Sequence, residues 1–277
     1  MLTIGMLLKI SRPRFWLYTA GPFLLGYILG LPAGFRQMYP LTFWLLFLYF
    51  LLPANVFLYG INDLFDRETD ALNGKKDSQE HRLAAQEQRS LIAVLAVSVI
   101  LSVAVLAVIP VGGWWLIVLF LLFSVFYSTP PLRFKTRPII DSYSNLLYVL
   151  PGFLGYWLTA QRFPPVAVVV GAICWAAGMH AYSAIPDIEP DRQSGVWTVA
   201  VLLGRQGTLL FVTLNWIIFA GVIIGITGRQ GIIALLYPTI PALLYFRERW
   251  NVARVYWWFP ALNGLFGFLV FVCKTLH

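Results

Sequence analysis

The sequence predicts an all-helical protein that crosses a membrane many times. The first observation is composition: 59% of the 277 residues are hydrophobic and 12% are charged, about half the charged share of an ordinary soluble domain. The second is the length of the apolar runs, many of which approach the ~20 residues that a helix needs to cross a bilayer. The third is that no apolar run carries a charged side chain across its middle. Together these observations exclude an ordinary soluble domain.

Nine apolar segments are expected to form membrane-spanning helices, and the whole of residues 1–277 is expected to form a single transmembrane domain. The first segment follows a short basic stretch, and no small-residue cleavage site comes after it, so an uncleaved helix is predicted rather than a signal peptide. The fourth and eighth segments are short and would need local thinning of the bilayer. The segments are residues 15–35, 41–61, 90–109, 113–129, 142–160, 164–184, 208–227, 231–246 and 255–273.

The charged residues predict the orientation in a cell inner or plasma membrane. With a cytoplasmic N-terminus, 16 of the 20 Lys and Arg residues fall on the inner side, as the positive-inside rule requires. The net charge of +8 is therefore read as topology, and no nucleic-acid partner is expected. All twelve Asp and Glu residues fall on the same side, which the rule does not require. This bias indicates that the chemistry takes place at the cytoplasmic face.

The first acidic motif is NDLFDRETD at residues 62–70, directly after an apolar run. If the helix continues, Asp63, Asp66 and Asp70 line one stripe with Asn62 beside them. Three carboxylates on one face repel each other unless a cation lies among them, and oxygen ligands of this kind suit Mg²⁺. Taken alone, the motif fits a solvated helix end equally well.

The second acidic motif lies in YSAIPDIEPDRQSG, after the sixth segment. Pro190 is expected to interrupt a helix that Pro186 starts, giving a distorted turn that still directs Asp187 and Asp191 inward. Both acidic motifs follow an even-numbered segment and therefore emerge on the same membrane face. Two such clusters would hold two or more Mg²⁺ ions around a diphosphate.

A third cytoplasmic connection, YSTPPLRFKTRP at residues 127–138, supplies cations. Arg133, Lys135 and Arg137 would neutralise a diphosphate from the side opposite the metal, although plain positive-inside retention explains them equally well. Further basic candidates lie beside the acidic motifs or before the first segment: Arg67, Arg192, Arg12 and Arg14.

Aromatic side chains near the inner ends of the segments would suit a site where a carbocation forms, because ring faces attract cations. Tyr59, Phe65, Tyr127, Tyr143 and Tyr182 have this position, although membrane-interface belts account for most aromatic residues. The histidines show no metal-binding spacing, and His180 is expected to be a packed or hydrogen-bonded residue.

With these motifs in view, the chain resembles the UbiA superfamily of intramembrane prenyltransferases. NDLFDRETD fits the family's NDxxDxxxD, DIEPD fits its DxxxD, YSTPPLRFK lies between them, and the resemblance covers nearly the whole chain. It implies a nine-helix bundle whose central cavity opens to the cytoplasmic face and whose site lies on loops 62–89, 130–141 and 185–207. It also implies metal binding by Asn62, Asp66, Asp70, Asp187 and Asp191, and a diphosphate contact by Lys135.

We accordingly expect catalysis to depend on Asp66, Asp70, Asp187, Asp191 and Lys135. The residues expected to bind the substrates are Asn62, Asp63, Arg67, Arg133, Lys135, Arg192, Arg14 and Tyr127. The stretches SRPRFWLYTAGPFLLGYILG and IPDIEPDRQSGVWTVAVLLG are most similar to carotenoid elongases. This implies transfer of a five-carbon unit from dimethylallyl diphosphate to lycopene, with Mg²⁺ as cofactor and a proton-accepting base that the sequence does not identify.

Two alternatives stay open at this stage. Aromatic quinone precursors are acceptors for relatives that share the same diphosphate motifs. A lipid transporter is the alternative outside enzymes, but its charged sites usually lie near the bilayer midplane, whereas here the charges lie at one edge. The sequence predicts no oligomeric state.

Overall fold

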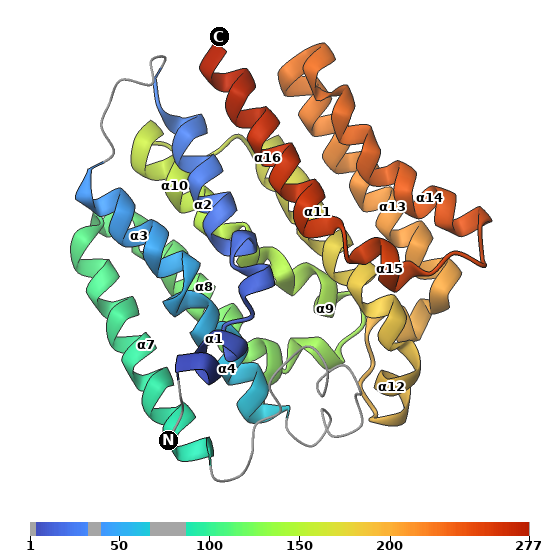
Figure 1. Cartoon of the computed structure of the whole chain (residues 1–277). Coiled ribbons are helices and arrows are strands. Elements are labelled where there is room, and N and C mark those ends of the chain that lie inside the picture. The colour runs from blue at the N-terminus through green and yellow to red at the C-terminus, as the bar shows by residue number, and fades with distance from the viewer. Residues whose placement is uncertain (1–3, 33–39, 67–86, 277) are drawn as a thin grey trace. The chain divides into compact units, whose positions relative to one another are not determined.

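The computed structural model describes residues 4–32, 40–66 and 87–276, and the regular structure within these ranges is helical throughout (Figure 1). The all-helical prediction is therefore confirmed. The chain forms two compact units. One contains Met1–Leu132 and Leu150–Phe163, and the other contains Arg133–Val149 and Pro164–Leu276. The chain therefore enters the second unit, returns to the first for a single helix, and then completes the second.

The first unit contains α-helices joined by short 3₁₀ turns. Its elements are α1 (Ile4–Ile10), η1 (Pro13–Phe15), α2 (Leu17–Gly30), α3 (Leu41–Leu51), α4 (Pro53–Phe65), α7 (Gln88–Val108), η3 (Val111–Gly113), α8 (Trp114–Ser128) and α10 (Leu150–Ala160).

The second predicted segment is two helices rather than one. The backbone breaks at Leu52, and Pro53 starts α4, where a missing N–H costs nothing. A carbonyl freed by this break must find another donor in an apolar environment. The carbonyl of Phe50 accepts hydrogen bonds from Asn55 Nδ2 at 2.8 Å and from Thr19 Oγ1 at 2.6 Å. The polar pair therefore stabilises the interruption.

Helices α2 and α10 pack against each other backbone to backbone. Their contact is lined by Gly26 and Gly30 on α2 and by Gly152 and Gly155 on α10. A Cβ atom on Gly152 would lie 2.9 Å from the carbonyl oxygen of Pro22, which is closer than real Cβ contacts come. Small residues permit this approach, and such close packing holds helices together where lipid replaces water.

The second unit contains the longest described helix, α13, with 29 residues. Its elements are η4 (Phe134–Thr136), α9 (Ile140–Tyr143), η5 (Ser144–Tyr148), α11 (Val166–Ala184), η6 (Ile185–Asp187), α12 (Ile188–Gln193), α13 (Val199–Thr227), η7 (Gly228–Leu235), α14 (Leu236–Phe246), α15 (Val252–Tyr256) and α16 (Phe259–Leu276).

An aromatic cluster forms the core of the second unit. Trp216 and Tyr182 are fully buried, and their rings stack at a centroid distance of 6.0 Å. Trp216 packs over Gly178, where a side chain would collide with it, and donates Nε1–H to the carbonyl of Trp175 at 3.2 Å. Tyr182 is thus a core residue, and the suggestion that its ring faces a reactive cation is not supported.

Six stretches of described helix are long and apolar enough to cross a membrane by length and composition. They are residues 41–65, 88–108, 111–128, 166–193, 199–246 and 252–274. Helices α2 and α10 cover the first and fifth predicted segments but have only 14 and 11 residues. The count of nine spanning helices therefore stays a prediction. The six long apolar stretches agree with the prediction of a membrane protein.

Candidate functional site

The first acidic motif lies at the end of α4. The helix ends at Phe65, and Asp66 caps it, with its backbone N–H donated to the carbonyl of Asn62 at 2.8 Å. Asp66 is 8% exposed and Asp63 is 3% exposed, so neither belongs to a solvated helix end. Arg67 and Asp70, which the sequence also places in this site, lie outside the described residues.

Ser128 brings two side chains of the motif together. As the last residue of α8, it directs its hydroxyl to Asp66 Oδ2 at 2.9 Å and to Asn62 Oδ1 at 3.2 Å. An amide oxygen and a carboxylate oxygen thus converge on one point at the end of the helix. Oxygen atoms of these types are the ligands that Mg²⁺ prefers, so the donor set fits this metal.

Asp63 faces a different partner. Arg12 Nη2 lies 3.1 Å from Asp63 Oδ1, and the guanidinium also lies 4.5 Å from the centre of the Tyr59 ring. Arg12 has a left-handed backbone, with φ of 50°. The sequence predicted a stripe of Asp63, Asp66 and Asp70, whereas the structure groups Asn62 with Asp66 and pairs Asp63 with an arginine.

The second acidic motif follows α11. Pro186 is the second residue of the 3₁₀ turn η6, and Asp187 lies at the N-cap of α12. Pro190 does not interrupt this helix, so the expected distorted turn is wrong. It is the third residue of α12. A backbone N–H in the first turn of a helix has no partner within the helix, so its absence at Pro190 costs little. Asp187 and Asp191 are partly exposed and lie four residues apart, so a short helix sets their spacing.

Several basic candidates have distinct environments. Lys135, in η4, is 8% exposed; a buried lysine is rare unless it is paired. Arg133 precedes it with a left-handed φ of 40°. Arg192 is exposed and pairs with Glu189 at 3.1 Å, and Arg14 lies 5.5 Å from the ring centre of Phe15. Tyr127, which directly precedes Ser128, is partly exposed.

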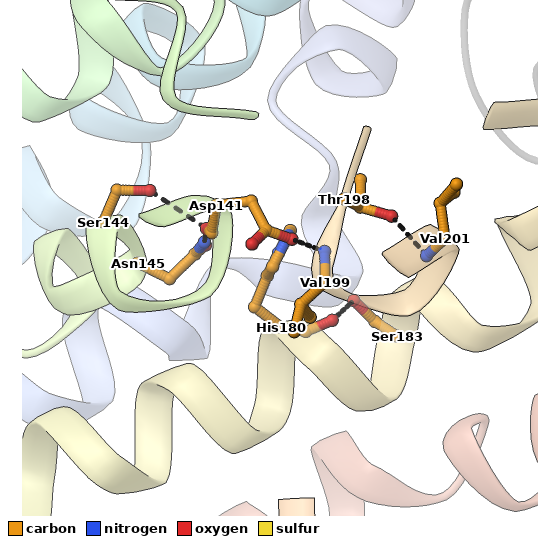
Figure 2. Close-up of polar contacts among 8 residues, drawn as sticks. All are labelled: Asp141, Ser144, Asn145, His180, Ser183, Thr198, Val199 and Val201. Carbon is orange, nitrogen blue, oxygen red and sulfur yellow. Dashed lines mark hydrogen bonds and ion pairs between the residues drawn. The ribbon is translucent and has the colours of Figure 1, made fainter. Parts of the chain in front are cut away.

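A buried carboxylate lies at the start of α9 in the second unit (Figure 2). Asp141 is fully buried, and its Oδ2 accepts the backbone N–H of Val199 at 2.9 Å and lies 3.6 Å from His180 Nε2. Its own carbonyl accepts hydrogen bonds from Ser144 and Asn145. Asp141 therefore connects α9, the end of α11 and the first residue of α13.

Sequence reasoning missed Ser128, the Arg12–Asp63 pair and the Asp141–His180 pair. Asp141 follows the Lys135 loop by a few residues and His180 precedes Asp187 by two helical turns, but this spacing does not show that the two side chains meet. In the described ranges, no group of three or more His, Cys, Asp or Glu side chains forms a complete metal-binding cluster. Within those ranges, the oxygen atoms of Asn62 and Asp66 therefore form a pair without a larger cluster of such side chains around it.

Long apolar helices with acidic side chains at their ends define an all-helical membrane protein. The model of the UbiA prenyltransferase family matches residues 18–269, a range that runs through both units. The chain therefore belongs to the UbiA prenyltransferase family, whose members are prenyl-transferring enzymes.

Two relatives of the chain are lycopene elongase/hydratases. The protein from Haloferax volcanii is 43% identical over 262 residues, covering 94% of this chain and 85% of the relative. The protein from Halobacterium salinarum is 43% identical over 263 residues, covering 94% of each. A solved UbiA homologue from Archaeoglobus fulgidus, bound to GPP and Mg²⁺, matches with a TM-score of 0.73 at 22% identity, covering 96% of this chain and 99% of the homologue. This likeness establishes the fold.

Proposed function

We propose that this protein transfers a five-carbon isoprenyl group from dimethylallyl diphosphate to lycopene or a related carotenoid. The observation that carries the proposal is the 43% identity, over 94% of the chain, to two lycopene elongase/hydratases. Membership of a prenyltransferase family supports the reaction class, and the relatives support the acceptor. A hydrocarbon acceptor is consistent with the predominantly apolar helices around the motifs.

In this proposal each acidic motif contributes ligands for the donor. Asn62, Asp66 and Asp70 of the first motif and Asp187 and Asp191 of the second would hold Mg²⁺ and, through it, the diphosphate. When bound, Mg²⁺ would supply the positive charge that stabilises the leaving diphosphate. The convergence of the Asn62 and Asp66 oxygens on Ser128 supports this assignment for the first motif.

Lys135 is the residue proposed to contact the diphosphate directly. Its side chain is buried, and a buried ammonium gains most from an anionic partner. Arg133, Arg192, Arg67 and Arg14 are proposed to add positive potential around the donor. Asp63 is assigned to positioning through Arg12, and Tyr127 to the boundary of the donor site.

The proposed reaction needs no deprotonation of the acceptor before attack. The allylic C–O bond breaks and its electron pair goes to the diphosphate. The π pair of the acceptor double bond forms the new C–C bond. A proton then leaves the carbon next to the resulting cation, and its C–H pair forms a new double bond. We further propose that the N-terminus and both motifs face the cytoplasm, where the soluble diphosphate is available.

Expression in a lycopene-accumulating host tests the proposal. We expect pigments whose masses increase in five-carbon steps, together with loss of this gain in Asp66→Asn and Asp187→Asn variants that still insert and purify normally. Removal of divalent metal by EDTA should abolish transfer by the purified protein, and added Mg²⁺ should restore it.

Other outcomes would point elsewhere. Unchanged lycopene together with a prenylated aromatic quinone precursor would replace the carotenoid by an aromatic acceptor. Full Mg²⁺-dependent turnover by either carboxylate variant would overturn the assignment of the motifs. Metal-independent lipid flux in vesicles, without prenyl transfer to any acceptor, would favour a transporter.

A further inference from the structure

We propose that His180 is the base that accepts the proton released when the new carbon–carbon bond forms, and that Asp141 is the positioning residue that orients its ring. This inference rests on the proposed prenyl transfer and names the residue for a step to which neither acidic motif is assigned. The supporting features are the burial of Asp141, the orientation of the imidazole ring and the place of His180 on α11 (Figure 2).

Asp141 orients one edge of the imidazole ring. Its carboxylate is fully buried, and Oδ2 faces His180 Nε2 at 3.6 Å while accepting the Val199 N–H at 2.9 Å. The partner of one ring nitrogen determines which nitrogen carries the proton in a neutral histidine. A carboxylate beside Nε2 favours a proton there, which leaves Nδ1 as the nitrogen that accepts.

The remaining oxygen of Asp141 gives a second reason. Oδ1 is buried and has no hydrogen-bond partner in the part of the chain that the structure describes. A buried carboxylate with so few donors costs free energy, and a positive charge on the neighbouring ring would offset this cost. The pair is therefore arranged to stabilise the imidazolium that proton transfer creates, as a carboxylate does for a catalytic histidine.

His180 also lies at a suitable distance from the second acidic motif. It precedes Asp187 by seven residues, so both lie on the same face of α11 and its 3₁₀ extension, about 10 Å apart along the axis. If Asp187 helps to hold the diphosphate, His180 lies deeper along that face, beside the hydrocarbon part of the donor. Its side chain is 16% exposed, whereas that of Asp141 is fully buried.

The other described carboxylates of the second unit are already engaged. Asp187 and Asp191 are assigned to metal binding, Glu189 pairs with Arg192, and Glu248 accepts a hydrogen bond from Gln206. His180 is also the one histidine in the described ranges, because His81 and His277 lie outside them. Within this unit it is therefore the side chain best suited to general-base chemistry.

The proton-transfer step balances without a further reactant. After the acceptor's π pair has formed the new C–C bond, the C–H pair beside the cation becomes the new double bond, and the proton passes to Nδ1 of His180. The resulting imidazolium is stabilised by Asp141. The imidazolium of His180 then returns its proton to water before the next turnover.

The test compares His180→Gln, His180→Ala and Asp141→Asn in purified protein, with whichever acceptor the wild type prenylates. Ser183→Ala is the matched control, because the Ser183 hydroxyl bonds to the backbone carbonyl of His180 at 2.7 Å and leaves the ring untouched. Binding of dimethylallyl thiolodiphosphate, an unreactive donor analogue, is measured beside product formation. His180→Asn replaces any His180 variant that does not fold.

We expect the His180 variants to form product about 10²–10⁴-fold more slowly, with analogue affinity within twofold of the wild type. Added imidazole should partly restore His180→Ala but not Asp141→Asn, which should fall at least tenfold. The inference is overturned if His180→Gln forms product at the wild-type rate. It is also overturned if the His180 variants lose affinity for the analogue in proportion to their loss of rate and added imidazole does not restore product formation by His180→Ala. Failure of the proposed function is distinct, because it appears in the wild type as transfer to another acceptor.

Discussion

The hydroxyl of Ser128 lies 2.9 Å from Oδ2 of Asp66, although the two residues are 62 positions apart in the chain. The contact joins the end of α8 to the end of α4 and also reaches Asn62. An aspartate at a frayed helix end samples several rotamers, but this one is held by a buried donor. Ser128 therefore sets the spacing of the oxygen atoms that we assign to metal binding.

Ser128→Ala should weaken the response to Mg²⁺ without unfolding the protein. Loss of a buried hydrogen bond costs about 1 kcal/mol, which corresponds to a roughly fivefold rise in the Mg²⁺ concentration for half-maximal transfer. Ser124→Ala is the control, because Ser124 lies one turn earlier in α8 and donates its hydroxyl to the carbonyl of Phe120 in the same helix. Equal Mg²⁺ titrations for the two variants would contradict the role of Ser128.

Lys135→Met should raise the KM for the diphosphate donor about ten- to hundredfold, because a charge-assisted hydrogen bond contributes about 1.5–3 kcal/mol. Initial rates measured against donor concentration give this value. Lys9→Met removes an equal charge from an exposed position on α1 and should leave the KM unchanged. A common shift in both variants would indicate a general effect of charge rather than a contact by Lys135.

The Arg12–Asp63 pair should be strongly coupled. Both side chains are largely buried, so removing one partner leaves an uncompensated charge. A double-mutant cycle of Arg12→Met and Asp63→Asn, read from unfolding in detergent, should give a coupling free energy of about 1.5–3 kcal/mol. The exposed pair of Glu189 and Arg192 provides the comparison and should give only about 0.3–0.5 kcal/mol. Similar values for the two pairs would refute the importance of burial.

Gly152→Val should destabilise the first unit by about 1–3 kcal/mol, because its side chain would collide with the backbone of α2. Melting temperature and the monodisperse fraction after purification report this loss. Gly221→Ala, on α13, has open space around the new Cβ and should be neutral or slightly stabilising. If the Gly152→Val protein is as stable as the wild type, α2 and α10 can move apart at no cost in free energy, and the prediction is wrong.

Local spacing explains what could be predicted from the sequence. Asn62 and Asp66 are one helical turn apart, so a helix alone brings them together, and the apolar runs around them predict helices without further information. Pro190 was misjudged because its effect depends on where α12 begins, which the sequence does not show. A shift of one turn in that start turns a helix-breaking proline into an acceptable one.

Long-range partners could not be predicted in the same way. Asp63 is 51 residues from Arg12, and Asp141 is 58 residues from Val199. These contacts depend on how the helices pack against each other. Helix packing depends on small residues and on the shapes of the helix surfaces, which the spacing of apolar residues in the sequence does not reveal. His180 appeared to be an ordinary packed residue because its carboxylate partner belongs to another helix.

The contact between α2 and α10 also has a consequence for the order of biosynthesis. α2 ends at Gly30, whereas α10 begins at Leu150, so a ribosome adding about 5–20 residues per second takes several seconds to supply the partner. During that time Phe23 and Tyr27 of α2 can already pack against Phe43 of α3, but the face of α2 that carries Gly26 and Gly30 lacks its partner helix. A nascent chain that stops before Leu150 thus holds most of the helices of the first unit but leaves the glycine face of α2 exposed to lipid, so we expect truncation there to leave the first unit unstable.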